Sequence, residues 1–413
     1  RYSAADVRIV NAHFGAHAAA YTLWEEGGMK NTENHVGVLP SWAKLDGQQE
    51  TQPSRFYLGG VGIVIPARNE AEQIGLTLES LLSQTKLPLR VIVVINNCTD
   101  GGATANKARS YRAVEVIEMT NNPFLKAGAL NAGVARILES TKVPEFLLTM
   151  DADTVPDPDF LMNTTNVMWH RPEVGAVSTV CDGKKGLGKN WSEKTLATLQ
   201  RLEYARAGFT RIRLNIHTMS GAGSMIRMQA AMDVIESRGE LFAQRMDNLV
   251  EDFETTLEIK RLGWKCVNNY YCHVQTDLMV TLPSLMKQRI RWVHGTINEL
   301  RRRGWKKESW LSALTMWYAL LSIPVFYLWV LLVGYHLTFG TPVPTDFWFL
   351  AIVIVFQAVS VYRLGWRMML LAAFTIPDLL FGMIRHVWIV TSLVKSFVRR
   401  SFKQPYRQSK LSW

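Results

Sequence analysis

The N-terminal part of the chain contains four polar segments, each beside a hydrophobic run, with side chains suited to phosphate and metal chemistry. They are Pro66-Ala67-Arg68-Asn69-Glu70, Asn96-Asn97-Cys98-Thr99-Asp100-Gly101, Lys126-Ala127-Gly128-Ala129-Leu130-Asn131 and Asp151-Ala152-Asp153. Two carboxylates two residues apart in a loop can both bind one hard divalent cation, whose coordination a diphosphate would complete. An Asp-x-Asp pair also arises by chance and from helix capping. Its place after a strand, together with three other polar loops, favours the metal interpretation.

Three later motifs add small, acidic and basic residues that could also take part in chemistry. They are Ser220-Gly221-Ala222-Gly223-Ser224, Val250-Glu251-Asp252 and Gln288-Arg289-Ile290-Arg291-Trp292. Asp252 precedes a predicted helix that Gly263 ends, so its carboxylate can serve as a general base or as a helix cap. Gln288, Arg291 and Trp292 share one face of a helix, where Arg291 can bind a diphosphate and Trp292 can stack on a sugar. The same segment also fits an amphipathic helix at a membrane surface.

The elements around the four polar segments alternate between strands and helices. The predicted strands are Val61–Ile65, Val91–Ile95, Val114–Glu118 and Phe146–Met150, and the predicted helices are Asn69–Ser83 and Ala127–Glu139. This alternation predicts a doubly wound α/β sheet, and such sheets bind ligands at the carboxyl ends of their strands. The polar segments are therefore expected to meet at one edge of the sheet.

The C-terminal part of the chain is strongly apolar. No Asp, Glu, Lys or Arg lies between Glu308 and Asp346, and Leu311–Leu337 would form a helix of about 40 Å, longer than a hydrocarbon core of roughly 30 Å. Phe347–Tyr362 extends to a second span when counted from Pro344 to Arg363. A third block, Met368–Val394, is interrupted by ionisable residues and fits a re-entrant hairpin, an interfacial helix or a third span.

The distribution of charge predicts the orientation of these spans. The chain carries 46 Lys and Arg against 35 Asp and Glu, a net charge of +11, and its basic clusters flank the apolar segments. Basic residues stay on the cytoplasmic side, so the polar domain and the basic tail are expected in the cytoplasm, with two full spans and a third block that does not cross. The basic run Arg301–Lys307 lacks the interleaved aromatic residues of a nucleic-acid groove, so membrane lipids are the expected partner and nucleic acid is not.

Taken together, IPARNE, NNCTDG, KAGALNAG, DAD and the three later motifs, in this order, resemble glycosyltransferase family 2. The QxxRW motif resembles that of the processive, membrane-bound members, such as cellulose, chitin, hyaluronan and poly-N-acetylglucosamine synthases. The resemblance covers about Val61 to Trp292. It implies an A-type glycosyltransferase fold, a Rossmann-like mixed sheet with helices on both faces. Amphipathic interface helices and C-terminal transmembrane helices would follow this fold.

The resemblance also implies roles for individual residues. Asp252, with Glu251 beside it, would be catalytic, and Asp151 and Asp153 would hold Mg²⁺ or Mn²⁺. The nucleotide and its diphosphate would contact Pro66, Arg68, Glu70, Asn97, Asp100, Lys126, Asp151, Ala152, Asp153, Gln288 and Arg291, and the acceptor would contact Gly221, Gly223, Ser224 and Trp292. The family usually has Asp-Asp-Gly-Ser where this chain has Asn96-Asn97-Cys98-Thr99. Because an amide offers a different pattern of donors and acceptors, this departure bears on the base, for which uracil is the expectation.

The predicted segments are 1–56 without an interpretable motif, a nucleotide-sugar half at 57–182 and an acceptor half at 183–280. Interface helices at 281–308, a membrane region at 309–394 and a basic tail at 395–413 follow. The expected activity is inverting, metal-dependent extension of a β-linked polysaccharide from a UDP-sugar at the plasma membrane, coupled to export. Its partners would be the donor, a growing glycan or lipid-linked acceptor, membrane lipids, and accessory subunits or a second copy.

Two alternatives to this activity stay open. A non-processive enzyme would move one sugar onto a lipid carrier or glycolipid, against which the QxxRW motif argues. A catalytically silent membrane receptor for nucleotide sugars or cyclic dinucleotides would not need the intact Asp151, Asp153 and Asp252.

Overall fold

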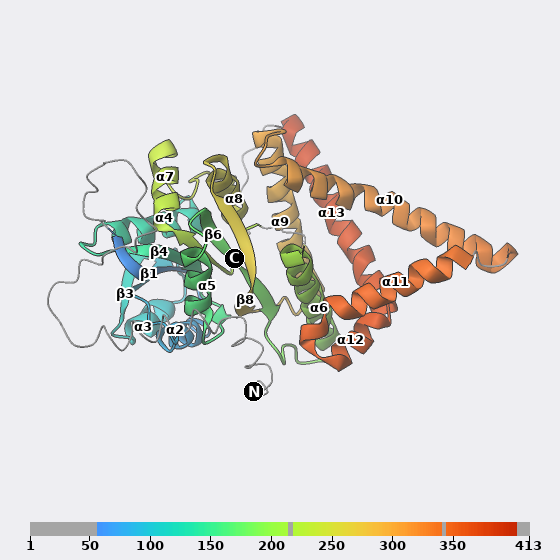
Figure 1. Ribbon diagram of the computed structural model, residues 1–413, viewed down its shortest axis with the longest axis horizontal. Helices are drawn as coiled ribbons and strands as arrows, with labels where there is room; N and C mark the ends of the chain where they lie inside the picture. Colours follow the sequence, from blue (N-terminus) through green and yellow to red (C-terminus); the bar gives the residue numbers. More distant parts are fainter. Residues whose placement is uncertain (1–55, 214–217, 341–343, 403–413) are drawn as a thin grey trace. The chain divides into compact units, whose positions relative to one another are not determined.

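A computed structural model of the chain describes residues 56–213, 218–340 and 344–402. The chain from Arg55 onward forms one compact unit, and the predicted N-terminal segment up to residue 55 lies outside the described residues. At the centre of the unit is an eight-stranded sheet with the order β3-β2-β1-β4-β7-β6-β8-β5 (Figure 1). Its strands are β1 Phe56–Ala67, β2 Arg90–Asn96, β3 Val114–Met119, β4 Val143–Met150, β5 Val155–Pro156, β6 Val174–Gly183, β7 Gly223–Arg227 and β8 Lys265–Thr276.

The first half of the sheet is parallel. Strand β1 lies between β2 and β4, with Ile63 opposite both Val91 and Leu148, and β3 is parallel to β2. Strands β1, β2 and β4 contain runs of β-branched and other apolar residues that are buried on both faces, as inner parallel strands require, whereas the edge strand β3 is half-buried and carries Glu115 and Glu118. The four strands expected from the sequence are confirmed.

The second half makes the sheet mixed. Strand β7 is antiparallel to β4 and to β6, β8 is parallel to β6, and the short β5 is antiparallel to β8. The expected mixed sheet of an A-type glycosyltransferase fold is therefore confirmed.

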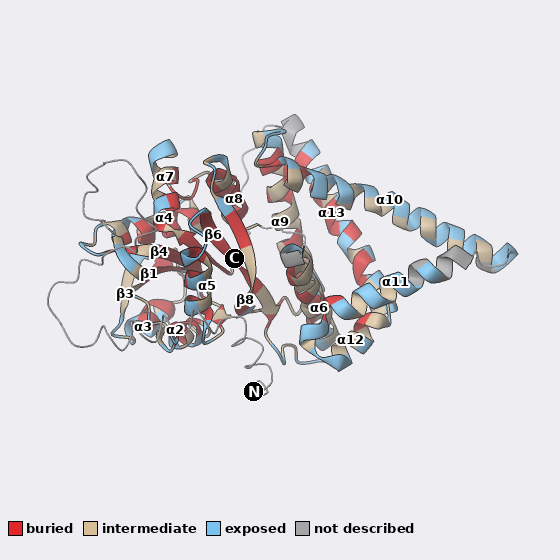
Figure 2. Ribbon diagram, viewed as in Figure 1, coloured by how far each residue is buried: buried red, intermediate tan, exposed pale blue. Residues whose placement is uncertain are grey.

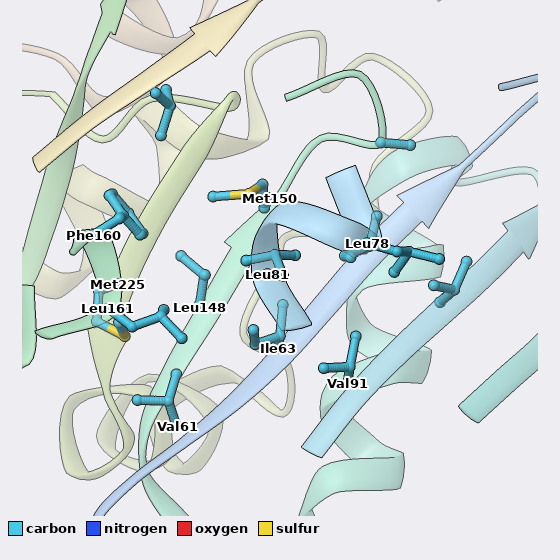
Figure 3. Packing of buried hydrophobic residues seen from close by; sticks show 14 of the residues in the cluster. Val61, Ile63, Leu78, Leu81, Val91, Leu148, Met150, Phe160, Leu161 and Met225 are labelled. Carbon is cyan, nitrogen blue, oxygen red and sulfur yellow. The ribbon is translucent and has the colours of Figure 1, made fainter. Parts of the chain in front are cut away.

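Helices cover both faces of the sheet. On one face lie α2 Ile74–Leu82, α3 Ala103–Arg109 and α5 Phe160–Trp169, and on the other lie α4 Leu125–Leu138, α7 Met228–Arg238 and α8 Glu251–Arg261 (Figure 1). Each layer has its own buried core (Figure 2). In the first, Leu78 and Leu81 of α2 pack with Ile63 and Leu148 of the sheet and with Phe160 of α5 (Figure 3). The two cores fix the sheet edge at which the polar segments lie.

The expected helices form with shifted starts. Helix α2 begins at Ile74 rather than near Asn69, because residues Glu70–Gln73 form a turn first, and α4 begins at Leu125. Helix α8 begins at Glu251, so Asp252 lies inside its first turn.

Helix α6 Trp191–Arg213, in the middle of the chain, packs on β6 and β8. The C-terminal helices are α9 Leu282–Arg303, α10 Trp310–Phe339, α11 Pro344–Ser360, α12 Trp366–Ala373 and α13 Ile376–Phe402. By length and composition, two helices in the described part can cross a membrane, over Trp310–His336 and Ile376–Phe397. The most apolar window of the first has no buried residue, whereas 39% of that in the second is buried.

The apolar blocks expected from the sequence correspond to these helices. The expected second span falls on α11, which has 17 residues and an apolar stretch at Ala351–Ser360. The third block forms α12 and the long α13, and the number of crossings stays a prediction. Asp378 of α13 pairs with Arg206 of α6 at 2.9 Å and accepts a hydrogen bond from Gln357 of α11, so this ionisable residue faces protein.

Candidate active site

Lys126 lies at the centre of a charged cluster at the carboxyl edge of the sheet. Its Nζ is 2.6 Å from Asp151 Oδ1 and 3.0 Å from Glu251 Oε1. Asp151 follows β4, Lys126 is in the first turn of α4, and Glu251 begins α8, so three elements meet there. The cluster lines a narrow pocket formed by Pro66, Lys126, Leu130, Thr149, Met150, Asp151, Met219, Ser220, Gly221, Ser224, Phe242, Glu251 and Asp252. Residues of four expected motifs are thus brought together with Pro66 of a fifth.

Asp252 faces the same pocket. Its Oδ1 accepts a hydrogen bond from the Phe253 backbone N–H at 2.7 Å, and the N-cap of α8 is Val250 rather than Asp252. A Cβ built on Gly221 would lie 3.3 Å from Asp252 Oδ2 and 3.1 Å from Lys126 Nζ. The carboxylate and the ammonium group therefore point toward one small space beside Gly221.

The electrostatics separate the roles of these groups. Burial raises the pKa of Asp252 to about 6, and the charge of Glu251 adds to the rise. Burial alone would lower the pKa of Lys126, but Asp151, Glu251 and Asp252 outweigh it and hold that pKa above its usual value. Burial works to raise the pKa of Glu251, yet the pairing with Lys126 leaves it below normal. The cluster thus contains a permanent cation and, in Asp252, a carboxylate that exchanges a proton near neutral pH.

The pocket has room for Lys126 and Asp252 because residue 221 is a glycine without a side chain. We expect Gly221→Ala to lower kcat/KM by up to about a hundredfold, because its methyl group would displace Lys126 Nζ and Asp252 Oδ2 from the pocket. Steady-state kinetics with a thermal unfolding measurement checks this. Gly382→Ala, whose methyl would meet only ordinary contact distances, is the control. A Gly221→Ala enzyme with wild-type kinetics would show that the pocket floor tolerates a side chain.

A second group of charges surrounds Asp153. Burial, and then the charge of Asp151, raises the pKa of Asp153 to about 6, while burial and then Asp153 raise the pKa of Glu70 to about 7. Asp277 contributes to both shifts and pairs with Lys184 at 2.8 Å. This excess of carboxylates is compatible with a bound cation.

Sequence reasoning missed Asp277 and Lys184. Asp277 directly follows β8 and Lys184 directly follows β6, so both occupy the kind of position that marked Asp151. The position directly after a strand could have identified both residues, but the sequence pattern did not predict β6 and β8 as strands.

In the loop that follows β2, Asp100 and Asn97 hydrogen-bond to nearby backbone groups. Asp100 accepts hydrogen bonds from the backbone N–H groups of Gly102 and Thr104 and from the Thr104 hydroxyl, which caps α3. Asn97 donates to the carbonyl of Asn122 at 2.8 Å and accepts from its N–H at 3.0 Å. The amide expected to meet the base therefore spends one N–H and one lone pair on the backbone of Asn122, and the Asp100 carboxylate is bound by the start of α3. Arg68 is half-buried after β1, and the buried Ala152 accepts a bond from Thr77.

The loop Ser220–Ser224 is held by hydrogen bonds within itself. Ser224 is buried in β7, and its hydroxyl accepts from the Ser220 N–H at 3.1 Å and donates to the Ser220 carbonyl at 3.0 Å. Gly223 is paired with Met150 of β4. Both residues shape the loop, and Gly221 opens the pocket.

Helix α9 carries the QxxRW motif, and of its residues Arg291 is near the charged cluster. Burial raises the pKa of Asp151 and acts to raise that of Glu251, while Lys126 and, to a smaller extent, Arg291 oppose this effect, so the Arg291 guanidinium lies within electrostatic reach of the cluster. Trp292 stacks instead with Arg289, whose guanidinium lies 4.6 Å from the ring centroid. Gln288 has a buried Oε1 atom without a hydrogen-bond partner.

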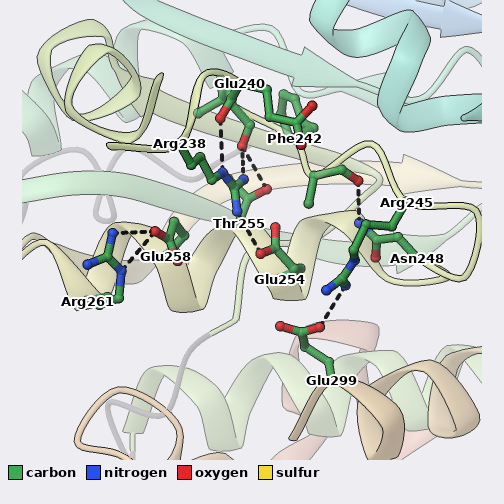
Figure 4. A network of polar contacts seen from close by, with 12 residues as sticks. Arg238, Glu240, Phe242, Arg245, Asn248, Glu254, Thr255, Glu258, Arg261 and Glu299 are labelled. Atoms are coloured by element: carbon green, nitrogen blue, oxygen red, sulfur yellow. Dashed lines mark hydrogen bonds and ion pairs between the residues drawn. The ribbon is translucent and has the colours of Figure 1, made fainter. Parts of the chain in front are cut away.

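An ion-pair network joins α8 to α9, and Figure 4 shows part of it. The buried Glu254 pairs with Arg238 at 2.7 Å and with Arg303 at 2.8 Å. The buried Glu299 of α9 pairs with Arg245 at 2.8 Å and with Arg303 at 2.7 Å. Arg303 therefore connects the first turn of α8 with the end of α9.

Two carboxylates, Asp151 and Asp153, are the residues here that could hold a divalent cation. The described part of the chain has no cluster of three or more metal-binding side chains, so the remaining ligands would come from a diphosphate and water. The raised pKa values of Asp153 and Glu70 fit a site whose negative charge a cation would balance.

The fold and the position of the site define an α/β protein of the A-type glycosyltransferase class. The chain belongs to glycosyltransferase-like family 2, whose family model matches residues 59–295, more than half of the chain. The family expected from the sequence is confirmed.

Several curated proteins are similar to this chain. A probable glucomannan 4-beta-mannosyltransferase 4 from Oryza sativa subsp. japonica is 24% identical over 58% of this chain and 44% of its own length. A poly-beta-1,6-N-acetyl-D-glucosamine synthase from Staphylococcus aureus is 25% identical over 58% of this chain and 55% of its own length. The chain thus spans about half the length of these relatives.

A solved mannosyltransferase from Pyrobaculum calidifontis, in complex with GDP-Man and Mn²⁺, has a similar fold. It covers 95% of this chain and 97% of its own, with a TM-score of 0.51 and 19% identity.

Proposed function

We propose that the protein is a membrane-embedded inverting glycosyltransferase that extends a β-linked polysaccharide from a nucleotide-sugar donor. The observation that carries the proposal is the pairing of Lys126 with Asp151 and Glu251 beside the free oxygen of Asp252. Family membership and the similarity to polysaccharide synthases support it.

In this proposal Asp252 acts on the acceptor. Its Oδ2 takes the proton of the attacking hydroxyl, while the hydroxyl oxygen bonds the anomeric carbon and the bond to the diphosphate breaks with its electrons on the leaving group. Direct displacement inverts the configuration, so an α-linked donor gives a β-linked product. Lys126 and Arg291 lie where negative charge develops. A cation held by Asp151 and Asp153 would supply Lewis-acid stabilisation of the diphosphate.

The donor is tested with a panel of radiolabelled nucleotide sugars. We propose UDP-sugars first, and GDP-mannose is included because the mannosyltransferase of similar fold is in complex with GDP-Man. Polymer on a sizing gel from one donor supports the proposal. A single added sugar on lipid favours the non-processive alternative, and no transfer or hydrolysis with any donor contradicts enzymatic activity.

We further propose that α10 and α13 anchor the protein in the plasma membrane with the catalytic site in the cytoplasm. The exposed apolar surface of α10 and the basic end of α9 support this. Retention of the full chain in membranes after alkaline extraction is the expected result, and release into the supernatant would contradict it.

Removal of divalent cations should stop transfer. With excess chelator we expect activity to fall to background and to return with Mg²⁺ or Mn²⁺, because Asp151 and Asp153 would otherwise face the diphosphate without compensation. Asp153→Asn should raise the Mn²⁺ concentration needed for half-maximal rate, with Asp159→Asn, an exposed carboxylate, as control. Full turnover in chelator would remove the metal role.

A further inference from the structure

A second cavity, of about 320 Å³, lies outside the charged cluster. Five elements form it: the end of β6, the second half of α6, strand β8, the last residue of α11, and the turn Tyr362–Leu364 that follows α11. Its lining residues are Val180, Asp182, Ala205, Gly208, Phe209, Tyr270, Tyr271, Ser360, Tyr362 and Arg363. The volume is at the small end of the range for small-molecule sites.

Aromatic rings form the walls and the mouth. The rings of Tyr270 and Tyr362 are stacked 6.4 Å apart with an interplanar angle of 8°, and their hydroxyl groups are hydrogen-bonded. Tyr271 packs edge-on against Tyr270 at 5.3 Å. Tyr271 is 59% exposed and Tyr362 is 40% exposed, so flat aromatic faces are available at the opening.

The charges in the cavity do not favour an anion. The guanidinium of Arg363 lies 4.5 Å from the ring centroid of Tyr270 and 2.8 Å from His273 Nδ1, so its positive charge already has partners. Asp182 Oδ2 is 3.3 Å from the same His273 atom, and Asp157 is within electrostatic reach of all three. Two carboxylates near one guanidinium would repel a phosphate headgroup. They remain able to accept hydrogen bonds from neutral hydroxyl groups.

The cavity is a near neighbour of the loop Ser220–Ser224. Strand β6 contributes Val180 and Asp182 to the cavity, and the residue between them, Cys181, has its sulfur 3.2 Å from the hydroxyl of Ser220 in the catalytic pocket. One strand therefore borders both spaces.

We propose that this cavity binds a neutral pyranose unit of the acceptor glycan, away from the reacting end. The apolar face of the sugar packs on Tyr362 and Tyr271, and its hydroxyl groups hydrogen-bond Asp182 and Arg363. This inference rests on the proposed transfer to a glycan. A subsite of this kind would retain the chain between successive additions and would therefore act on product length.

The test measures binding of β-1,4-mannotetraose and of a β-1,6-linked N-acetylglucosamine tetramer to the full chain in detergent by calorimetry. For Tyr362→Ala we expect about tenfold weaker binding of the preferred tetramer, because about one aromatic contact is lost. We also expect this variant to make shorter polymers. Asp182→Asn tests the polar side of the cavity independently. Trp169→Ala, which removes an exposed ring from α5, is the control.

The outcomes separate this inference from the proposed function. Wild-type protein that transfers sugar, together with a folded Tyr362→Ala variant of unchanged affinity and product length, overturns the glycan subsite alone. Binding of phosphatidylglycerol vesicles that falls in Tyr362→Ala, without any tetramer binding, overturns it in favour of a lipid site. Absence of transfer by the wild type with every donor contradicts the proposed function, whereas tetramer binding lost in Tyr362→Ala still supports the subsite.

Discussion

Asp252→Asn is expected to abolish sugar transfer while donor binding persists. Asparagine has the same shape and can still accept the Phe253 N–H bond at the start of α8, but its amide cannot take a proton from the acceptor. Loss of a general base typically costs about 10² to 10⁴ in rate. We therefore expect kcat to fall by about that factor, with the dissociation constant of the nucleoside diphosphate nearly unchanged.

The measurement pairs single-turnover transfer with calorimetric binding of the nucleoside diphosphate. Asp247→Asn is a matched control, because Asp247 precedes the same helix and its side chain is 71% exposed. Transfer by Asp252→Asn at the wild-type rate would exclude Asp252 as the base. Loss of both transfer and nucleotide binding would indicate that the carboxylate organises the pocket instead.

Much of this site was predictable because parallel strands bring their carboxyl ends to one edge. Asp151 after β4 and Lys126 at the start of α4 are far apart in sequence from Glu251, yet the motif order placed all three at this edge, and the structure joins them. Strands β1, β2 and β4 were predictable because each contains a continuous apolar run that is buried in the sheet.

The rest depended on features that sequence patterns do not display. Strand β8 contains Asn268, Asn269 and Tyr270, and its pairing with β6 shifts register, so neither strand showed a simple periodicity and Asp277 was not found. Asn97 has a positive φ of 52°, and its amide bonds the backbone of Asn122, a local arrangement that no periodic pattern encodes.

The third apolar block of the membrane region also depends on a contact that sequence patterns do not display. Asp378 was taken as an interruption of the apolar block, although its partner, Arg206, lies on a helix far away in the sequence. An ionisable residue with a protein partner does not face lipid, so α13 continues where a lipid-facing helix would be broken. The pairing of Arg206 with Asp378 forms only in the tertiary structure, so the sequence pattern could not predict it.

Glu299→Ala, in the ion-pair network between α8 and α9, is expected to cause a large loss of stability. The side chain of Glu299 is 2% exposed and pairs with Arg245, Arg302 and Arg303. Removing one member of a buried ion pair leaves the opposite charge uncompensated, which typically costs about 3 to 5 kcal/mol. The melting temperature of the full chain in detergent should therefore drop markedly, whereas Glu236→Ala, on the exposed face of α7, should leave it nearly unchanged.

The pH dependence of this loss provides a check that a simple packing defect would not pass. Burial acts to raise the pKa of Glu299, but hydrogen bonds from Arg302, Arg245 and Arg303 outweigh it and lower the pKa from 4.5 to about 2. Since the folded-state pKa is below the unfolded one, the stabilisation is present above about pH 4.5 and is lost as the pH falls toward 2. The difference in melting temperature between wild type and Glu299→Ala should shrink over that range. A difference that stays constant with pH would contradict the ionic role of Glu299. It would indicate that α8 and α9 are joined by packing rather than by charge.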